Sequence, residues 1–500
     1  MYERLWYSGL ATAAAALMML GCGGNKGSAG PAPTNVNALA GDGQATISWT
    51  PTPGVYDWLW LAQSAADVII GNSGNATTIK IGVTPPYVMG GLTNGLPYSF
   101  ALNGHSGDVN APGGAQSSSV SATPRLADTW TTCANCPTSV TTLYGVAFGD
   151  NGTAQTNGET IHTYLVVGSG GAMFTSLDAQ NWTALPGQIN CTPSSGGALR
   201  AAAYGWGTFV ALGDAGTICF SGPTSQNSSA VVLVSSTSPS TASWFKPTTN
   251  PLTSPLPNLY AVATNQSVWN ATSGTFVAVG SSGTVIYSGN GDTWYLWGTP
   301  ATTNELYAVH YNSCGLPNLY WVTVGANGTI LYTTSSSPAV SWTAVPAQNI
   351  AFPNGISSST ALRGIACTPN STPSPTPGVA PATTIPLWVA AGDNGVLLTS
   401  KDGLSWATPA NFTINGNAAT KFPNNVQNIT FGSQFVAIGD NGAIYTSPDG
   451  ATWTTQSSGL TSSLYGIAQP QGNAVPNANF GFVPYGYSAV GAAGMTTFGH

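Results

Sequence analysis

The sequence predicts an all-β protein, and three observations support that prediction. A module of three short strands and two tight turns, clearest from Phe435 to Trp453, recurs between Leu143 and the C-terminus at a period of about fifty residues. A further strand, such as Leu464 to Ala468, precedes each copy, and a tryptophan marks the outgoing strand. Four strands repeated at this period are typical of the blade of a β-propeller.

Within the module, each segment has the residues that its expected structure requires. Phe435 to Ile438 is apolar and predicts a strand, and Gly439 to Gly442 predicts a tight turn whose Gly and Asn positions accept positive φ. Ala443 to Ser447 is the returning strand. The next turn contains Asp449, whose side chain can accept backbone N–H groups two residues on, and Trp453 begins the last strand.

The number of copies predicts seven blades in residues 126–500. The paired glycines of the first hairpin are Gly168/Gly171, Gly213/Gly216, Gly280/Gly283, Gly325/Gly328, Gly392/Gly395, Gly439/Gly442 and Gly491/Gly494. The matching tryptophans are Trp182, Trp244, Trp294, Trp342, Trp406 and Trp453, with Trp130 upstream as the seventh. The last copy ends after its third strand. We therefore expect the segment around Asp128 to Thr131 to supply its outer strand and to close the ring.

The N-terminus has the features of an export signal. Met1 to Leu20 contains Arg4 and an apolar run that is too short to span a bilayer, which predicts a signal peptide over residues 1–21. The run ends in Leu20-Gly21-Cys22 and resembles the lipobox of bacterial lipoproteins. The resemblance implies that Cys22 is lipidated and that residues 22–33 form a tether. The alternative is an ordinary signal peptide that happens to precede a cysteine.

Residues 34–125 predict a separate domain of short alternating strands. Ala45 to Trp49, Leu92 to Phe100 with Tyr98, and Ser118 to Pro124 resemble the second strand, the tyrosine corner and the closing strand of a fibronectin type III domain. The resemblance implies a β-sandwich. The domain has no Arg-Gly-Asp sequence, so we expect a rigid spacer rather than a cell-attachment module.

Composition limits the classes of partner. Only 5% of residues are charged and 42% are hydrophobic, and the net charge is −7. From residue 126 onward there are five basic and eleven acidic residues, which argues against a nucleic-acid partner. There is no Ser/His/Asp order, phosphate loop or metal-ligand cluster, since His162 and His310 are isolated. We therefore expect no catalytic residue, metal or cofactor.

The cysteines other than Cys22 are even in number, which predicts disulfides in an exported chain. Cys314 and Cys367 follow the first strands of adjacent blades and form the favoured pair. Cys133 and Cys136 form a CxxC that could be a disulfide, a redox dithiol or half a zinc site, and neither a helix N-terminus nor further zinc ligands are evident.

Two more cysteines have open roles. Cys191 competes as a partner for the CxxC, whereas Cys219 occupies a position that is apolar in other copies. Cys219 is therefore expected as a buried free thiol.

Short turns of the form Ser-x-Asp-Gly-x-x-Trp resemble the Asp-box of the BNR propeller superfamily. They are Ser400 to Trp406 and Ser447 to Trp453, with degenerate copies at Ser176 to Trp182 and Ser288 to Trp294. The superfamily includes sialidases, sortilin-like receptors, xyloglucan-active hydrolases and the photosystem II assembly factor, so the resemblance implies a fold and leaves function open. It also implies that Asp178, Asp402 and Asp449 are structural. Asp214, Asp393 and Asp440 are expected as residues of the first hairpin turns.

The arginine count argues against a sialidase. Members of that group bind the substrate carboxylate with three arginines, and the propeller has only Arg200 and Arg363. A hydrolase of neutral glycans would need two convergent carboxylates. The acids that the repeat turns do not explain are Asp150, Glu159 and Glu305, with Asp128 on the closing strand, and nothing in the sequence pairs them.

The second position of each first strand predicts a ring of side chains around one rim of the channel. These residues are Tyr144, Arg200, Tyr260, Tyr307, Arg363, Gln427 and Tyr465. One interpretation is packing between blades, with the tyrosine hydroxyls satisfied at the edge. The other is a recognition surface, because arginine and tyrosine are enriched at interface hot spots.

Together these features predict a non-enzymatic, lipid-anchored binding scaffold of the bacterial envelope. We expect an outer-membrane lipoprotein that faces the periplasm or the cell surface and binds an envelope protein or polysaccharide. One alternative is a glycan-binding or glycoside-hydrolase module. Another is a surface matrix component, suggested by the neutral Ser/Thr/Asn-rich composition.

Overall fold

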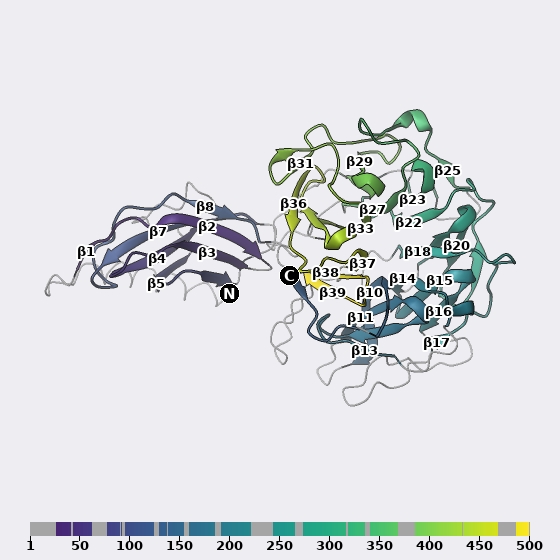
Figure 1. Ribbon diagram of the computed structural model, residues 1–500, viewed down its shortest axis with the longest axis horizontal. Helices are drawn as coiled ribbons and strands as arrows, with labels where there is room; N and C mark the ends of the chain where they lie inside the picture. Colours follow the sequence, from purple (N-terminus) through teal and green to yellow (C-terminus); the bar gives the residue numbers. More distant parts are fainter. Residues whose placement is uncertain are drawn as a thin grey trace, which may run out of the picture. The chain divides into compact units, whose positions relative to one another are not determined.

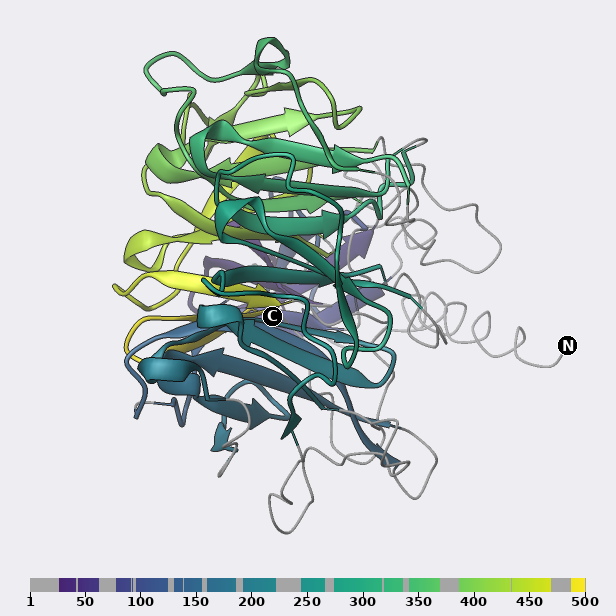
Figure 2. The same cartoon turned by 90° about the vertical axis from the view of Figure 1, so that its right-hand side faces the viewer.

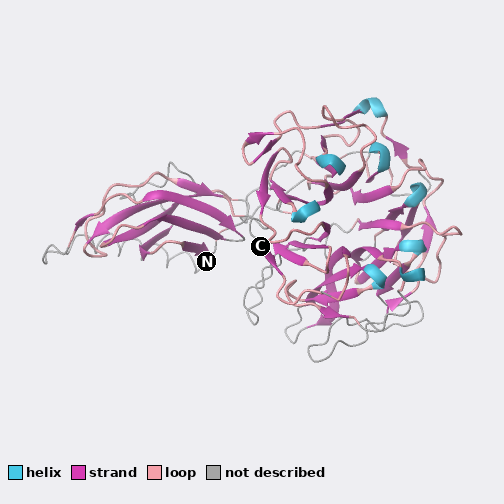
Figure 3. Cartoon of the chain, in the orientation of Figure 1, coloured by secondary structure: helices cyan, strands magenta, loops and turns pink. Residues whose placement is uncertain are grey.

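A computed structural model describes residues 27–41, 44–62, 78–90, 92, 96–124, 130–137, 139–154, 160–185, 192–221, 244–265, 274–316, 319–335, 341–368, 386–432, 434–468 and 487–499. The chain divides into two compact units, Met1–Leu126 and Ala127–His500. Strands dominate both, and the helical elements among the described residues are short 3-10 turns (Figure 3). The all-β prediction is confirmed. No helix in the described ranges is long and apolar enough to cross a membrane.

The first unit contains two antiparallel sheets. One has the order β1-β7-β4-β5 with β8 added to β7, and the other has the order β2-β3-β6. The strands are β1 (Ser28–Ala29), β2 (Thr34–Gly41), β3 (Gln44–Thr50), β4 (Val55–Ala62), β5 (Thr78–Val83), β6 (Tyr87–Gly90), β7 (Tyr98–Ser106) and β8 (Val120–Ala122). Alternate residues of β3, β4 and β7 share one apolar cluster, which packs the two sheets together.

The core of the first unit contains one buried carboxylate. Trp49 and Tyr98, which the sequence predicts as core residues, are 5% and 8% exposed. The Trp49 indole N–H donates to Asp57 Oδ2 over 2.6 Å. Burial raises the pKa of Asp57, although this hydrogen bond and the nearby His105 act in the opposite direction. The buried Asp57 is therefore a hydrogen-bonded part of the core.

The second unit is a succession of antiparallel sheets, each built from consecutive strands except the last. The first strands are β10 (Leu143–Ala154), β14 (Leu199–Gly205), β18 (Leu259–Thr264), β22 (Leu306–Tyr311), β27 (Leu362–Cys367), β33 (Val426–Phe431) and β37 (Leu464–Ala468). The second strands are β11 (Thr160–Gly168), β15 (Thr208–Gly213), β19 (Phe276–Gly280), β23 (Trp321–Gly325), β28 (Trp388–Gly392), β34 (Phe435–Gly439) and β38 (Tyr487–Gly491).

The outer half of each sheet follows the same plan. The third strands are β12 (Met173–Ser176), β16 (Ile218–Ser221), β20 (Val285–Ser288), β24 (Ile330–Thr333), β29 (Leu397–Ser400), β35 (Ile444–Ser447) and β39 (Thr496–Gly499). The fourth strands are β13 (Thr183–Ala184), β17 (Trp244–Phe245), β21 (Trp294–Leu296), β25 (Thr343–Ala344), β30 (Trp406–Ala407), β36 (Thr452–Gln456) and, for the last sheet, β9 (Trp130–Thr132).

The sheets form a closed ring. Each first strand contacts the first strand of the next sheet, and β37 of the last sheet contacts β10 of the first (Figure 1). Large side chains fill the space between sheets; for example, Trp294, Trp406 and Trp453 are at most 1% exposed. Sheets arranged radially in this way have the architecture of a β-propeller.

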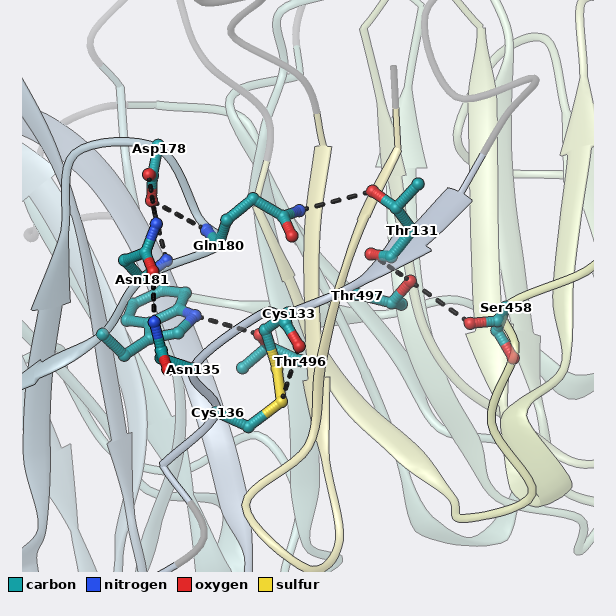
Figure 4. The surroundings of a disulfide bond; sticks show 11 residues. Thr131, Cys133, Asn135, Cys136, Asp178, Gln180, Asn181, Ser458, Thr496 and Thr497 are labelled. Carbon is teal, nitrogen blue, oxygen red and sulfur yellow. Dashed lines mark hydrogen bonds between the residues drawn. A yellow bond between two sulfur atoms is a disulfide. The ribbon is translucent and has the colours of Figure 1, made fainter.

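The last sheet is completed by a strand from the other end of the unit, as the sequence predicts. Strand β9 pairs antiparallel with β39, with Trp130 opposite Gly499 and Thr132 opposite Thr497. Hydrogen bonds beyond the strand pairing hold this junction (Figure 4). Thr497 Oγ1 donates to the Thr131 carbonyl over 3.1 Å, and the Trp182 indole of the first sheet donates to Thr496 Oγ1 over 3.0 Å.

The turn between the second and third strands requires both of its paired glycines, but for two different reasons. The sequence predicts only one of these reasons, positive φ. Asn441 and Gly442 have φ values of 58° and 69°, as expected. Gly439 is extended, with φ −166°, so the expectation of positive φ is wrong there. A Cβ on Gly439 would lie 1.9 Å from the Asn425 carbonyl oxygen, and this close approach is what requires glycine.

Six of these turns contain a short 3-10 segment. They are η1 (Ser169–Gly171), η4 (Asp214–Gly216), η5 (Ser281–Gly283), η6 (Ala326–Gly328), η8 (Asp393–Gly395) and η9 (Asp440–Gly442). The short helices gather at one side of the unit, on the left in Figure 2. Two further 3-10 segments, η3 (Ser194–Gly196) and η7 (Ala347–Asn349), lie in connections between sheets.

Connecting segments also extend two outer edges. Strand β26 (Ile350–Ala351) pairs parallel with β30, and β31 (Thr413–Ile414) pairs parallel with β36 and antiparallel with β32 (Asn417–Ala418). The connection between sheets thereby covers an edge that would otherwise expose unpaired backbone groups.

Candidate functional site

The ring predicted from the sequence surrounds one cavity of the second unit. The cavity has a volume of about 330 Å³ and is lined by all seven predicted side chains. They are Tyr144, Arg200, Tyr260, Tyr307, Arg363, Gln427 and Tyr465. We call them the ring residues.

Each ring residue is the extra residue of a β-bulge. In the first sheet, Leu143 pairs with Gly168 and Gly145 with Val167, so Tyr144 has no partner on the adjacent strand. The same register shift occurs at the corresponding position of every other sheet in the ring. A bulge interrupts the regular alternation of a strand and redirects a side chain. Simple alternation, on which the packing interpretation depends, therefore does not hold at this position.

The residue after the bulge is Gly or Ala in six of the seven sheets, and the exception is Asn428. A Cβ on Gly145 would lie 2.7 Å from the Cα of Ala201 on the next first strand. Gly364 and Gly466 face the neighbouring backbone at similar distances, 2.7 and 2.6 Å. The backbones of neighbouring first strands therefore approach closely at these residues. The recurring Gly or Ala at this position is a sequence signal that could have indicated the bulge.

A second tier of cavity residues lies two positions after the ring residues, and sequence reasoning missed it. Its members share small or branched apolar side chains and line the same cavity. They are Val146, Ala202, Val262, Val309, Ile365, Ile429 and Ile467. We call them the aliphatic tier. The sequence feature that could have predicted this tier is the apolar residue at the fourth position of each first strand.

Both ring arginines are held by an aspartate of their own sheet. Arg200 Nε and Nη2 donate to Asp214 over 2.5 and 3.2 Å, and Arg363 donates in the same way to Asp393 over 2.5 and 2.9 Å. Burial lowers the pKa of Arg200, but the hydrogen bond and charge of Asp214 outweigh it and raise the pKa overall. The pKa of Arg363 is raised chiefly by its hydrogen bond to Asp393. The turn aspartates thus also orient the ring, a role that the sequence analysis did not assign.

Aromatic contacts join neighbouring ring residues. The Arg200 guanidinium lies 5.2 Å from the ring centroid of Tyr144 and 5.7 Å from that of Tyr260. Arg363 lies 4.9 Å from the centroid of Tyr307. The centroids of Tyr144 and Tyr465 are 5.6 Å apart. Cation–π contacts of this kind fix the guanidinium planes as well as the tyrosines.

Glu305 fixes one side of the ring. It accepts hydrogen bonds from the hydroxyls of both Tyr260 and Tyr307. Burial and the hydrogen bond to Glu305 raise the pKa of Tyr307 well above its usual value, and burial also raises that of Tyr260. Glu305 was considered from the sequence as one of two convergent carboxylates. Glu159 and the side chain of Asp150 lie outside the described residues, as does Asp128.

Gln427 occupies the remaining position of the ring. Its Nε2 donates to Asp440 Oδ1 over 2.9 Å, and Asn425 Nδ2 donates to Asp440 Oδ2 over 2.8 Å. Asp440 thus serves Gln427 as Asp214 and Asp393 serve the arginines. Unlike the arginine–aspartate pairs, the Gln427–Asp440 pair contains no positively charged group.

The Asp-box residues lie in turns between third and fourth strands and hold the turn backbone. Asp449 Oδ1 accepts the N–H groups of Ala451 and Thr452 over 2.9 and 2.7 Å, and the Trp453 indole donates to the Gly450 carbonyl. Asp402 and Asp178 make the equivalent backbone contacts. None of the three lines the cavity.

The cysteines form disulfides in a pattern that corrects one expectation. Cys314 is bonded to Cys367 and Cys133 to Cys136, with Cα separations of 5.8 and 5.3 Å. The disulfide within the CxxC means that Cys133 and Cys136 do not pair with Cys191. Cys219 is disulfide-bonded, so its interpretation as a free thiol is wrong. Apolar residues occupy the equivalent position in other copies because that position is buried. A disulfide-bonded cysteine fits a buried position as well as a free thiol does.

Two predicted cysteine sites cannot be placed in the fold. Cys22 and Cys191 both lie outside the described residues. Within the described ranges there is no group of three or more His, Cys, Asp or Glu side chains that could hold a metal ion.

Comparisons with known proteins give distant similarities. No family model and no curated protein matches the chain. Among solved structures, YCF48 bound to D1 peptide has a TM-score of 0.46 and 13% identity, covering 74% of this chain and 94% of that one. YCF48 from Cyanidioschyzon merolae has a TM-score of 0.43 and 14% identity, covering 74% and 98%. The Neurospora crassa Pan2 WD40 domain has a TM-score of 0.43 and 9% identity, covering 74% and 94%.

Proposed function

We propose that the protein is a non-enzymatic binding scaffold of the bacterial envelope. In this proposal residues 1–21 are a signal peptide, Cys22 carries the lipid anchor, and residues 22–33 form the tether. Residues 34–125 form a fibronectin type III spacer, and residues 126–500 form a seven-bladed propeller that binds a protein partner at its central cavity.

One observation carries the binding proposal. The residues that differ most from the repeat pattern, two arginines and a glutamine among tyrosines, are the bulged residues around a single cavity. Both arginines are about one third exposed at the side chain while being held rigidly by an aspartate. Arginine and tyrosine that are already ordered lose little entropy on binding, which favours recognition.

The experiment compares partner binding by the wild type with that by a charge-neutral ring variant. Replacing arginine alone would leave a half-buried aspartate unpaired, so each pair is changed together: Arg200→Gln with Asp214→Asn, and Arg363→Gln with Asp393→Asn. Proteins retained from envelope extracts are identified by mass spectrometry, and the binary affinity of the purified partner is then measured.

We expect each paired replacement to weaken binding by about 1 to 2 kcal/mol, the usual scale for an interface arginine. Equal affinity of wild type and variant for every retained protein would remove the cavity from the proposed function. A glycan array probed with the same two proteins tests the polysaccharide alternative.

Anchoring is tested separately. Cys22→Ser should move the protein from the membrane fraction to the soluble fraction, because the acyl chains supply the membrane-binding energy. Retention of the variant in the membrane fraction would contradict the lipid anchor while leaving the binding proposal intact.

A further inference from the structure

We propose that the central cavity binds an uncharged peptide segment, whose apolar side chain enters the aliphatic tier while its backbone is hydrogen-bonded by one side of the ring. This inference rests on the proposed function and specifies the chemistry of the partner. It follows from an asymmetry of the ring, from its charge balance and from the wall beneath it.

The ring has one side whose polar groups are free to bind. Among the described residues, the hydroxyls of Tyr144 and Tyr465 and the Oε1 of Gln427 make no hydrogen bond, and these three residues are consecutive around the ring. Arg200 and Arg363 flank them, and each uses only Nε and Nη2 to bind its aspartate. We call these five residues the open arc. It offers both donors and acceptors, as the N–H and C=O groups of a peptide require.

The opposite side of the ring is already satisfied. The hydroxyls of Tyr260 and Tyr307 both donate to Glu305, and the face of Tyr307 is covered by the Arg363 guanidinium. A ligand that competed for these hydroxyls would leave the half-buried carboxylate of Glu305 without its donors, which is costly. Direct contacts to a partner are therefore expected on the open arc.

The charges of the ring and the apolar wall of the cavity together favour a neutral ligand. Each arginine is paired with its own aspartate at hydrogen-bond distance, so neither presents an uncompensated positive charge to the cavity. Asp440 and Glu305 add negative charge that only neutral groups contact. An acidic peptide would therefore meet excess negative charge, and a basic side chain that entered the aliphatic tier would bury its charge there without a partner.

The aliphatic tier distinguishes a peptide from a sugar. Val262, Val309, Ile365, Ile429 and Ile467 line the cavity two positions along each strand from a ring residue. The polar Asn428 and Thr430 also line it, and the Asn428 amide is already bonded to the backbone of Tyr465 and Ile429. A neutral sugar carries hydroxyls on all sides and would bury some of them against these side chains without partners. A leucine or phenylalanine side chain would bury apolar surface there and leave its own backbone at the level of the open arc.

The test uses capped tripeptides as probes of the full chain that begins at residue 22 with Cys22→Ser. Isoleucine methyl groups are labelled, and the resonances of Ile365, Ile429 and Ile467 are followed by NMR during titration. The probes are Ac-Gly-Leu-Gly-NH2, Ac-Gly-Phe-Gly-NH2, Ac-Gly-Asp-Gly-NH2, Ac-Gly-Lys-Gly-NH2 and the neutral sugar methyl-glucoside. We expect saturable shifts of these methyl resonances with the two apolar peptides alone.

Hydroxyl deletions locate the contact. Tyr465→Phe removes one uncommitted hydroxyl and should raise the Kd of the apolar peptides about fivefold, the effect of one hydrogen bond. Tyr307→Phe removes a hydroxyl that Glu305 already occupies and should change the Kd less than about twofold. Tyr287→Phe, in a tyrosine outside the cavity lining, serves as the matched control.

Several outcomes would overturn the inference: equal shifts with charged peptides or the sugar, no shifts with any probe, or a larger effect of Tyr307→Phe than of Tyr465→Phe. If these occur while the paired arginine replacements still weaken binding of an envelope protein, the proposed function stands and only the chemistry of the partner is wrong. If the arginine variants instead capture the envelope protein and respond to the peptides as the wild type does, the partner binds elsewhere on the chain.

Discussion

The sheet that closes the ring and the sheet before it have the same four-strand plan but are held together in different ways. In the earlier sheet, β36 follows β35 through an Asp-box turn, and Asp449 holds that turn through the backbone of Ala451 and Thr452. In the closing sheet, β9 comes from the opposite end of the unit, and Thr131 lies 366 residues from its partner Thr497. One sheet depends on local contacts and the other on a long-range contact.

The comparison indicates where the stability of the ring is most vulnerable. A local turn forms at small entropic cost, whereas pairing distant segments requires closing a long loop first. The closing sheet has no Asp-box turn, and it is tied instead to the first sheet by Trp182 and Gln180, which donate to Thr496 and Thr131. The closing contact should therefore form last and matter most.

The largest effect should come from removing the closing strand. Replacing residues 126–132 with a Gly/Ser sequence of equal length should destabilise the second unit by at least about 4 kcal/mol, because the Trp130 side chain and the pairing with β39 are both lost. Urea unfolding followed by tryptophan fluorescence measures this. An unchanged midpoint would mean that β9 contributes nothing to ring closure.

Of the disulfides whose two cysteines are both described, the one that closes the longer loop should contribute more to stability. Replacing Cys314 and Cys367 by alanine removes a link between internal sheets across 53 residues and should cost about 4 kcal/mol. Replacing Cys133 and Cys136, which are 3 residues apart beside the closing strand, should cost only about 2 kcal/mol. Thermal unfolding of the two double variants decides the order, and the reverse order would show that the CxxC disulfide positions β9.

Acid should weaken the internal sheets through their Asp-box turns. Burial alone would raise the pKa values of Asp178, Asp402 and Asp449, but hydrogen bonds, chiefly from turn backbone N–H groups, outweigh it and lower them. Their contribution to stability is therefore present above the unfolded pKa of 3.8 and is lost as pH falls through the lower folded-state values. Urea midpoints measured during acidification should fall less in the triple Asp→Asn variant than in the wild type.

The first unit provides an internal control for the acid experiment. Burial raises the pKa of Asp57, so its contribution to stability is present at low pH and is lost as pH rises through the folded-state value. Acidification should thus affect the two units in opposite directions through these carboxylates. An identical acid response of the triple variant and the wild type would show that the Asp-box carboxylates do not govern the loss.

The smallest effect concerns the turn of the closing sheet. Ala493 has a φ of 58°, a conformation that alanine disfavours, whereas the equivalent residue of the preceding sheet is Asn441. Ala493→Asn should therefore stabilise the unit by up to about 1 kcal/mol. Asn441→Ala is the matched control and should destabilise by a similar amount; a gain from both substitutions would contradict the explanation.

The repeat, and with it the propeller, could be predicted from the amino-acid sequence alone. The glycines and tryptophans recur because the backbone and the core of every sheet require them at the same position, so the repeat can be recognised in the sequence. Trp130, which lies upstream of the first full copy, indicated the closing strand. The ring residues were found for the same reason, because their position in the repeat is fixed. The first glycine of each pair was misinterpreted, since a turn residue suggests positive φ while the actual requirement is a close approach to another strand.

The contacts of the ring residues, in contrast, could be identified only in the folded chain. The carboxylates that hold Arg200, Arg363 and Gln427 come from hairpin turns on the adjacent strand, and the aliphatic tier becomes a cavity wall only when separate first strands converge. The division into an open arc and a side held by Glu305 depends on that carboxylate bonding both Tyr307, two residues away, and Tyr260 of the preceding sheet. The Tyr260–Glu305 contact leaves no periodic trace in the sequence, because it involves a single pair of side chains that only the packing of neighbouring sheets brings together.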